Sequence, residues 1–399
     1  MKIVVICGSY MPNYSAVGIC AKNVVNEFVK LGHDVTVIAE RTAIPITESH
    51  IEEIRHISSL YLDLYFSSNR FVRLIYRIIR YLGAILSLKN IKYDIVKAYL
   101  KELKDVNRCD KIDLIVPMCF PFESILAANK FAEIHQAEVL PVVFDNLVMN
   151  NNYNRLKLNR ILKQQVHLEL LKEVIAKSKK VFVIHSQKSF FEQKFNKEMH
   201  KIAFIEHPLL LRPEREQRTS TTVFYAGSFL KGYVPSSDMV KILEKVVPQV
   251  QNHFEFCVMG DDLRSIKTLT AKFPDKIRNN GTIPFKEVME KIADVGFLIS
   301  VAETRGVQIS SKIFTYISTG KPIIHFYYAN NDINLSVLKK YPLLCPINLK
   351  DSDKDNLVDK LVSFLNVEHK IVDFDKIQTL FSDALPESLV NNIISALND

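Results

Sequence analysis

The residues best suited to chemistry lie in the segment 303–324, where Glu303 and Arg305 are followed by Ser311 and Lys312. A helix beginning at Ser311 would direct free backbone N–H groups and the positive end of its dipole outward, beside the Lys312 ammonium group. This combination favours binding of an anion such as a diphosphate. The alternative is an ordinary connecting helix whose lysine is solvated.

The sequence on both sides of this helix predicts the elements that position it. The apolar run 295–301 and the run after Pro322 are short and rich in branched residues, as strands buried on both faces are. Ser310 is suited to cap the helix, and Gly320 to end it in a left-handed conformation. In a strand–loop–helix–strand unit, the loop and the helix start lie at the carboxyl edge of a parallel sheet, where α/β folds bind ligands.

The composition allows two domains with substantial cores, because the chain has 399 residues, of which 48% are hydrophobic. The six cysteines form no Cys-x-x-Cys pair, so we expect a reduced, cytoplasmic protein without structural zinc. The opening run 2–7 is too short and strand-like for a signal sequence, and no membrane span is predicted. The net charge of +8 favours acidic partners, but no motif that reads RNA or DNA is present, so nucleic acid is not expected.

The chain opens with a predicted strand, a loop and a helix. Residues 2–7 form the strand, and apolar residues recur at helical spacing from 19 to 31. Gly18, at the helix start, would let a ligand phosphate approach the backbone, or it eases a turn. The pattern Gly-x-Gly-x-x-Gly is absent, which disfavours dinucleotide binding of the dehydrogenase type.

A later strand, 139–144, delivers the polar pair Asp145 and Asn146 to the carboxyl edge of the same predicted sheet. Asp145 would orient a substrate hydroxyl or cap the following turn. Two prolines and a run of charges after residue 207 mark the best domain boundary. We therefore expect an N-terminal domain at 1–207, a C-terminal domain at 208–385, and a helix at 386–399 that packs back toward the first domain.

A basic amphipathic helix is predicted between residues 69 and 88. Arg70, Arg73, Arg77 and Arg80 share one narrow stripe at 100° per residue, and the apolar side chains fall on the opposite side. Such a helix can lie on an anionic membrane surface. The alternative is a domain helix whose apolar face packs on the sheet and whose arginines face water.

Several short motifs resemble those of GT-B glycosyltransferases, most closely the bacterial, family-four-like enzymes of surface polysaccharide synthesis. The order and spacing match over essentially the whole chain, and the last motif is the strongest. The motifs are Leu31-Gly-His-Asp-Val-Thr-Val, Tyr225-Ala-Gly-Ser, Val258-Met-Gly, Gly281-Thr-Ile-Pro, Ile292-Ala-Asp-Val and Ser311-Lys-Ile-Phe-Thr-Tyr-Ile-Ser-Thr-Gly-Lys-Pro-Ile-Ile.

The resemblance implies an α/β fold of two facing Rossmann-like domains with parallel sheets and an inter-domain cleft. The N-terminal domain would bind the acceptor and the C-terminal domain the nucleotide-sugar. The family implies retention of configuration and no metal, because protein cations and helix N-termini neutralise the leaving diphosphate. No cofactor is expected besides the nucleotide-diphosphate sugar, which is a co-substrate.

The resemblance also implies roles for single residues. Lys312 and the backbone of Ser311 would hold phosphate, and Lys231, in the loop after Gly227, is a second phosphate candidate. Gly18 would approach the diphosphate from the other domain. The loop with Glu303 and Arg305 would face the transferring sugar.

One departure from the family pattern concerns a pair of glutamates separated by seven residues. Counted back from Gly320, the two positions hold Val307 and Thr315, and neither is acidic. Thr315 offers one hydroxyl where a carboxylate accepts two hydrogen bonds from a ribose. Glu303 lies four residues before the first of these positions.

The leading hypothesis is a metal-independent, hexosyltransferase-type enzyme with catalytic candidates Glu303, Arg305 and Asp145. The donor would be a nucleotide-diphosphate sugar, and the acceptor a glycan. If the arginine helix touches the inner face of the cell membrane, the acceptor would be lipid-linked. The first alternative is a non-catalytic GT-B module that assists a partner glycosyltransferase. A nucleotide-sugar 2-epimerase of the same fold ranks lower, because the sequence shows no acidic and histidine-rich cleft.

Overall fold

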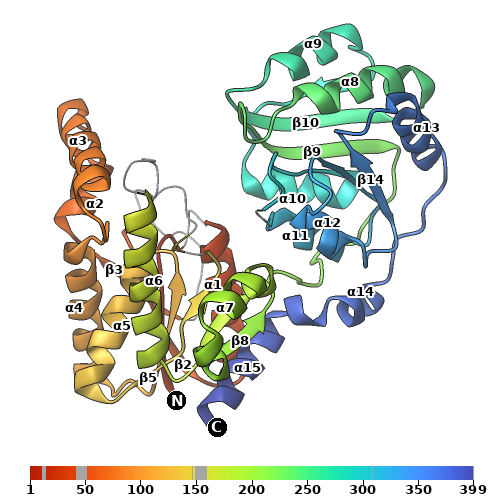
Figure 1. Cartoon of the computed structure of the whole chain (residues 1–399). Helices are drawn as coiled ribbons and strands as arrows, with labels where there is room; N and C mark the ends of the chain where they lie inside the picture. Colours follow the sequence, from red (N-terminus) through yellow and green to blue (C-terminus); the bar gives the residue numbers. More distant parts are fainter. Residues whose placement is uncertain (11–14, 42–51, 146, 149–159, 308, 399) are drawn as a thin grey trace. The chain divides into compact units, whose positions relative to one another are not determined.

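The computed structural model describes residues 1–10, 15–41, 52–145, 147–148, 160–307 and 309–398. Asn146, predicted to accompany Asp145, lies outside these residues. The chain divides into unit 1, which comprises 1–209 and 383–399, and unit 2, which comprises 210–382 (Figure 1). The C-terminal helix, expected to return to the first domain, is part of unit 1 and packs on its first helix.

Unit 1 is a parallel sheet with the strand order β3-β2-β1-β4-β6-β7-β8, and β5 pairs with β4. Its strands are β1 (Lys2–Cys7), β2 (Asp34–Glu40), β3 (Glu53–Ile57), β4 (Leu114–Cys119), β5 (Glu138–Val139), β6 (Val142–Val143), β7 (Val181–Ile184) and β8 (Ile202–Ile205). Its helices are α1 (Ala16–Lys30), α2 (Leu60–Phe66), α3 (Arg70–Leu86), α4 (Tyr93–Cys109), α5 (Phe122–His135), α6 (Arg160–Lys177), α7 (Lys188–Lys194) and α15 (Pro386–Asn398).

The core of unit 1 follows the alternation of side chains along its strands. Val4 and Ile6 belong to one apolar cluster with residues of α4, α5 and α6. The intervening residues Ile3 and Val5, also fully buried, point to the opposite face, which α1 contacts. The uninterrupted apolar run of β1, which follows Lys2, is therefore explained by helices on both faces of the sheet.

Unit 2 is a six-stranded parallel sheet with the order β11-β10-β9-β12-β13-β14. Its strands are β9 (Thr222–Phe229), β10 (His253–Gly260), β11 (Ile277–Asn279), β12 (Phe297–Val301), β13 (Ile323–Tyr327) and β14 (Leu344–Asn348). Its helices are α8 (Ser237–Val246), α9 (Arg264–Lys272), α10 (Phe285–Asp294), α11 (Lys312–Ser318), α12 (Ile333–Leu338), α13 (Lys354–Leu365) and α14 (Phe374–Leu380).

The order of strands in unit 2 reverses at β9, the first strand of the unit. The chain adds β10 and β11 on one side of β9 and then crosses to add β12, β13 and β14 on the other. In doubly wound sheets, the crevice at the carboxyl ends of the two strands flanking such a reversal is the usual ligand site. In unit 2 these strands are β9 and β12.

Gly320 ends α11 as the sequence predicts, with φ of +73°. A Cβ atom at this position would lie 2.2 Å from the carbonyl oxygen of Val372, whose N–H donates to the Gly320 carbonyl. Glycine is therefore required both by the left-handed conformation and by the close approach of another segment.

We predict that Gly320→Ala destabilises unit 2 more than Gly281→Ala does. Gly281 has a similar φ of +65°, but a Cβ atom there would meet no other atom within 4 Å, so this change isolates the conformational cost, about 1–2 kcal/mol. Gly320→Ala adds displacement of the Val372 carbonyl, roughly 1–3 kcal/mol more. Urea denaturation of both variants measures the difference, and equal losses would contradict it.

Candidate functional site

The strands β9 and β12 pair at two positions, Phe297 with Val223 and Leu298 with Phe224. Beyond these pairs, toward the carboxyl end, the carbonyl oxygen of Ala226 accepts a hydrogen bond of 3.0 Å from Lys312 Nζ. The Lys312 ammonium group therefore lies beside β9 at the reversal of strand order, where a ligand site is expected.

Lys312 is the first residue of α11, and its ammonium group also lies 5.3 Å from the centroid of the Tyr225 ring. It forms no ion pair with any residue that the structure describes. Desolvation of the ammonium end lowers the pKa of Lys312 to about 8, although the residue as a whole is exposed. The site thus holds a cation that no carboxylate of the described chain neutralises.

Gly227 makes room for this cation. A Cβ atom at position 227 would lie 2.3 Å from Lys312 Nζ and 2.9 Å from the Tyr225 hydroxyl. The loop expected directly after Gly227 begins later in the chain, because β9 continues to Phe229 and Gly227 pairs with Val258 of β10. The missing side chain, rather than a flexible backbone, is what the site uses.

The start of α11 differs from the predicted one. The helix begins at Lys312, and Ser311 occupies the N-cap position without a side-chain cap bond. The backbone N–H of Ser310 donates a hydrogen bond to Asn334 Oδ1 at 2.7 Å, and this bond fixes Ser310. Since α11 has seven residues, its dipole is weak and the Lys312 ammonium group supplies most of the positive charge. Thr315 lies half-buried in the second turn.

Glu303 lies in the loop between β12 and α11 and is buried. Its Oε1 accepts from the Val307 N–H at 2.6 Å, and its Oε2 accepts from the Arg305 N–H at 2.9 Å and from Arg305 Nε at 3.4 Å. These bonds fix the loop. The Arg305 side chain is 52% exposed, so the outer part of its guanidinium group faces solvent.

A buried polar network, which the sequence did not reveal, holds the same loop from the other side. His325 joins Ser300 Oγ at 3.1 Å and Asp332 Oδ1 at 3.1 Å. Asp332 caps α12, and the next residue donates its N–H to the Gly306 carbonyl at 3.0 Å. The path from β12 to Lys312 is therefore anchored to β13 and α12.

Two other lysines of unit 2 differ in their surroundings. Lys231 lies past the end of β9, where its N–H donates to Asp261 Oδ1 at 2.9 Å and its side chain is exposed. Lys321 is fully enclosed, and its Nζ donates to the carbonyls of Ile292, Ala293 and Val295 at 2.8, 2.6 and 2.5 Å. Lys321 thus satisfies the carboxyl end of α10 and is structural.

The candidates in unit 1 lie in the loops and helix starts that follow its strands. The N–H of Gly18 donates to Ser15 Oγ at 3.1 Å, and a Cβ atom at position 18 would lie 2.2 Å from the Ser9 carbonyl oxygen. Local packing therefore already requires this glycine. Asp145 is half-buried, and burial raises its pKa while nearby His207 lowers it. Among the described residues of both units, no group of three His, Cys, Asp or Glu side chains could hold a metal ion.

No protein-family model matches this sequence, and no curated protein matches it. Solved structures do match over the whole length. TarM has a TM-score of 0.62 at 10% identity, covering 100% of this chain and 99% of TarM. The catalytic domain of starch synthase IV from Arabidopsis thaliana, bound to ADP and acarbose, has a TM-score of 0.60 at 9% identity, covering 100% of this chain and 98% of that one.

WaaG, a glycosyltransferase involved in lipopolysaccharide biosynthesis, has a TM-score of 0.56 at 12% identity, covering 98% of this chain and 99% of WaaG. These structures are GT-B glycosyltransferases, so the comparison confirms the predicted α/β fold of the GT-B type. At identities of 9 to 12%, the likeness is one of fold.

We predict that Lys312→Met changes the dependence of stability on pH. The pKa of Lys312 is about 8 in the folded protein and near 10.5 ordinarily, so the unfolded chain binds more protons between these values. The contribution of Lys312 to stability is therefore least favourable below pH 8 and improves as the pH rises through this window. The gain in unfolding free energy from Lys312→Met should shrink from pH 7 to about pH 10. Lys267→Met, at an exposed lysine of the same unit, is the matched control, and an equal pH trend in both would contradict the prediction.

We predict that Glu303→Ala loosens the loop before α11. The Arg305 and Val307 N–H groups lose their acceptor, which costs about 1–3 kcal/mol and speeds their hydrogen exchange. Exchange measured by mass spectrometry should rise at Arg305 and Val307 and stay unchanged there after Glu287→Ala, at an exposed glutamate of α10. Unchanged protection in the loop would show that Glu303 does not hold it.

Proposed function

We propose that this protein is a glycosyltransferase that moves a sugar from a nucleotide-diphosphate donor to a glycan acceptor. The observation that carries the proposal is the Lys312 ammonium group, which lies over Gly227 at the reversal of strand order without a carboxylate partner among the described residues. A diphosphate bound there would supply the missing negative charge. Its arrival would also raise the pKa of Lys312 toward the ordinary value.

The proposed chemistry is a transfer between two oxygen atoms. The bond from the anomeric carbon to the diphosphate oxygen breaks, and the diphosphate leaves with the electron pair. The acceptor hydroxyl oxygen forms the new bond to the anomeric carbon, and its proton passes to the departing phosphate or to water. Lys312 would stabilise the negative charge that grows on the leaving oxygen. In an enzyme that uses no metal ion, protein cations provide this stabilisation.

The neighbouring residues take supporting parts in this proposal. Glu303, whose carboxylate already accepts bonds from its own loop, would act as a positioning residue. Arg305, whose guanidinium group is half-exposed, would contact the sugar or the phosphate directly. Lys231 remains a second phosphate candidate and Thr315 a partner for one ribose hydroxyl.

Two of the matching structures support the substrate classes. The starch synthase domain is bound to ADP, and WaaG is involved in lipopolysaccharide biosynthesis. We therefore propose a role in bacterial surface polysaccharide synthesis, with retention of configuration and a lipid-linked acceptor at the inner face of the membrane. Asp145, in unit 1, would orient the acceptor hydroxyl, and Gly18 would leave room near the diphosphate.

The alternative is a non-catalytic GT-B module that assists a partner enzyme. It is favoured by Val307 and Thr315, which occupy the positions of the usual glutamate pair; Val307 is 59% exposed and offers no polar side chain. A module of this kind would bind no nucleoside diphosphate, or would bind it without turnover.

Calorimetry with UDP, ADP and GDP, followed by assays of donor hydrolysis and transfer, distinguishes the two. We expect Lys312→Ala to weaken nucleoside diphosphate binding by about tenfold or more, because a charge-assisted hydrogen bond is lost. Gly227→Ala should act similarly by displacing the ammonium group, and the two changes together should not add. Lys267→Ala is the control. Undiminished affinity in Lys312→Ala would remove the phosphate role, and binding without turnover would favour the module.

A further inference from the structure

Helix α3 presents its apolar face to solvent. Phe71 is 68% exposed and Leu86 is 77% exposed. The other exposed apolar residues of this face are Leu74, Ile75, Ile78, Ile79 and Leu82. The sequence left open whether this face packs on the sheet, and the structure shows that it does not. Contiguous apolar surface of this kind marks an interaction site.

One flank of α3 attaches the helix to the rest of unit 1. Among its described side chains only Tyr76 is buried, and its hydroxyl lies 3.1 Å from the hydroxyl of Tyr61 on α2. The Tyr76 ring also lies 5.3 Å from the ring of Tyr65. In Figure 1, α3 lies at one end of unit 1 with α2 next to it. The helix is thus held by a tyrosine cluster while its apolar face remains uncovered.

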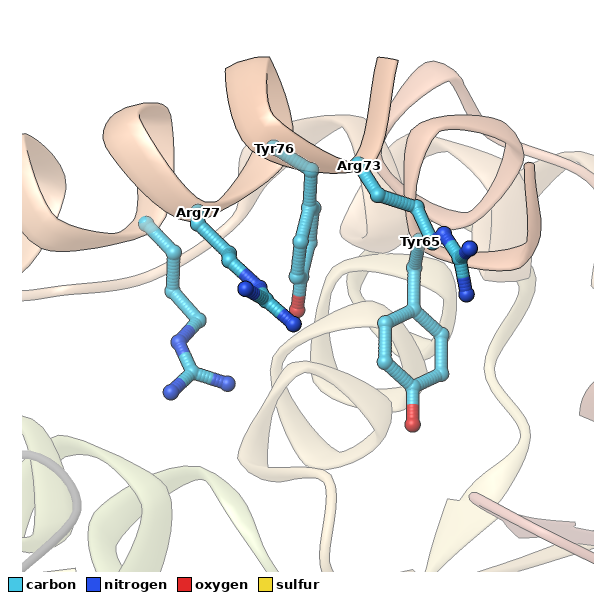
Figure 2. A pocket seen from close by; sticks show the side chains of 5 residues that line it. Tyr65, Arg73, Tyr76 and Arg77 are labelled. Carbon is cyan, nitrogen blue, oxygen red and sulfur yellow. The ribbon is translucent and has the colours of Figure 1, made fainter. Parts of the chain in front are cut away.

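The side of α3 that carries Tyr76 is also basic. Arg73, Arg77 and Arg80 line an open pocket of about 380 Å³ together with Tyr65 and Tyr76. Figure 2 shows Tyr65, Arg73, Tyr76 and Arg77 extending to the same side of the helix. No acidic residue occurs in α3, and none of its arginines forms an ion pair with a described residue. The pocket therefore offers several guanidinium groups to an anion.

The dimensions of α3 exclude a crossing of the bilayer. Its 17 residues span about 25 Å, and they carry four arginines. No helix in the described part of the chain combines the length and apolar character of a membrane span. A helix with one apolar and one basic side of this length lies along a membrane surface instead.

We propose that α3 docks this protein on an anionic phospholipid membrane, with its apolar face among the acyl chains and lipid phosphates bound by Arg73, Arg77 and Arg80. One guanidinium group can donate hydrogen bonds to two oxygens of the same phosphate, and the Tyr65 hydroxyl, which lines the same pocket, can donate a further bond. The apolar side chains supply the part of the affinity that does not depend on charge.

Two other occupants would each complement only one side of α3. A second copy of the chain, paired through the apolar faces, would cover those faces but would leave the arginines on the other side of each helix without an anion, because α3 contains no acidic residue. A soluble phosphate would explain the pocket but leaves the apolar face uncovered. An anionic membrane complements both faces of the helix at once.

This surface extends the proposed function, because a lipid-linked acceptor requires the enzyme at a membrane. The docking itself is measured without a sugar donor. If the wild-type protein binds a nucleoside diphosphate but not anionic vesicles, the docking alone is overturned. If it binds anionic vesicles but no nucleoside diphosphate, the donor site alone is overturned.

The test is sedimentation of the full chain with vesicles of phosphatidylcholine, with and without phosphatidylglycerol. We expect binding to the anionic vesicles and a fall of about thirtyfold or more in Arg73→Glu/Arg77→Glu. The control is Lys101→Glu/Arg108→Glu, which makes the same charge change on α4, where both side chains are exposed; its binding should stay close to wild type. Phe71→Ser/Ile78→Ser should also weaken binding, although it leaves every charge in place.

Three outcomes would overturn the proposal. They are equal wild-type binding to neutral and anionic vesicles, an equal loss in the α4 control, and a stable dimer in light scattering that Phe71→Ser/Ile78→Ser dissociates. Competition by soluble glycerol phosphate, with vesicle binding unchanged in the arginine variant, would assign the pocket to a free phosphate instead. Circular dichroism and thermal unfolding confirm that each variant is folded.

Discussion

The candidate site depends on one contact, in which the Lys312 ammonium group rests on the Ala226 carbonyl over a strand that has no side chain at position 227. A cation held in this way has given up part of its hydration without receiving a carboxylate in return. The surrounding structure must therefore hold it there. Glu303 fixes one end of the loop that leads to α11, and Asp332 and Asn334 fix the rest of it. The ammonium group is placed by a chain of bonds that begins in the sheet.

Comparison of Lys312 with Lys321 shows how the number of bonding partners separates a candidate phosphate-binding lysine from a structural one. Burial lowers the pKa of both to about 8. Lys321 donates to three carbonyl oxygens at the end of α10, so its capacity for hydrogen bonds is filled by the protein. Lys312 donates to one, over Gly227, and it retains capacity for a ligand.

The sequence predicted the elements whose pattern is continuous and whose ends carry strong signals. The strand β1 and the unit from β12 through α11 to β13 were found because apolar runs are bounded by glycine and proline. The short strand β3 and the helices α2 and α4 were missed, since no glycine or proline marks their ends. Periodicity identified the two faces of α3 but could not say which face the protein covers, because that depends on the packing of α2 against it. Likewise, a glutamate after a strand suggested a site residue, whereas the backbone N–H groups that donate to its carboxylate lie within its own loop.

The placement of α15 in unit 1 has a consequence for how the protein is made. Residues 210–382 form unit 2 and are complete before residues 383–399, which supply the helix that packs on α1, leave the ribosome. Chains generally fold domain by domain during synthesis. Here the later unit can finish first, while the first-made sheet keeps the apolar side of α1 partly uncovered until residues 383–399 have been made. During that interval the nascent chain is most dependent on chaperones, and a chain that stops before residue 383 would have a complete second unit and an incomplete first.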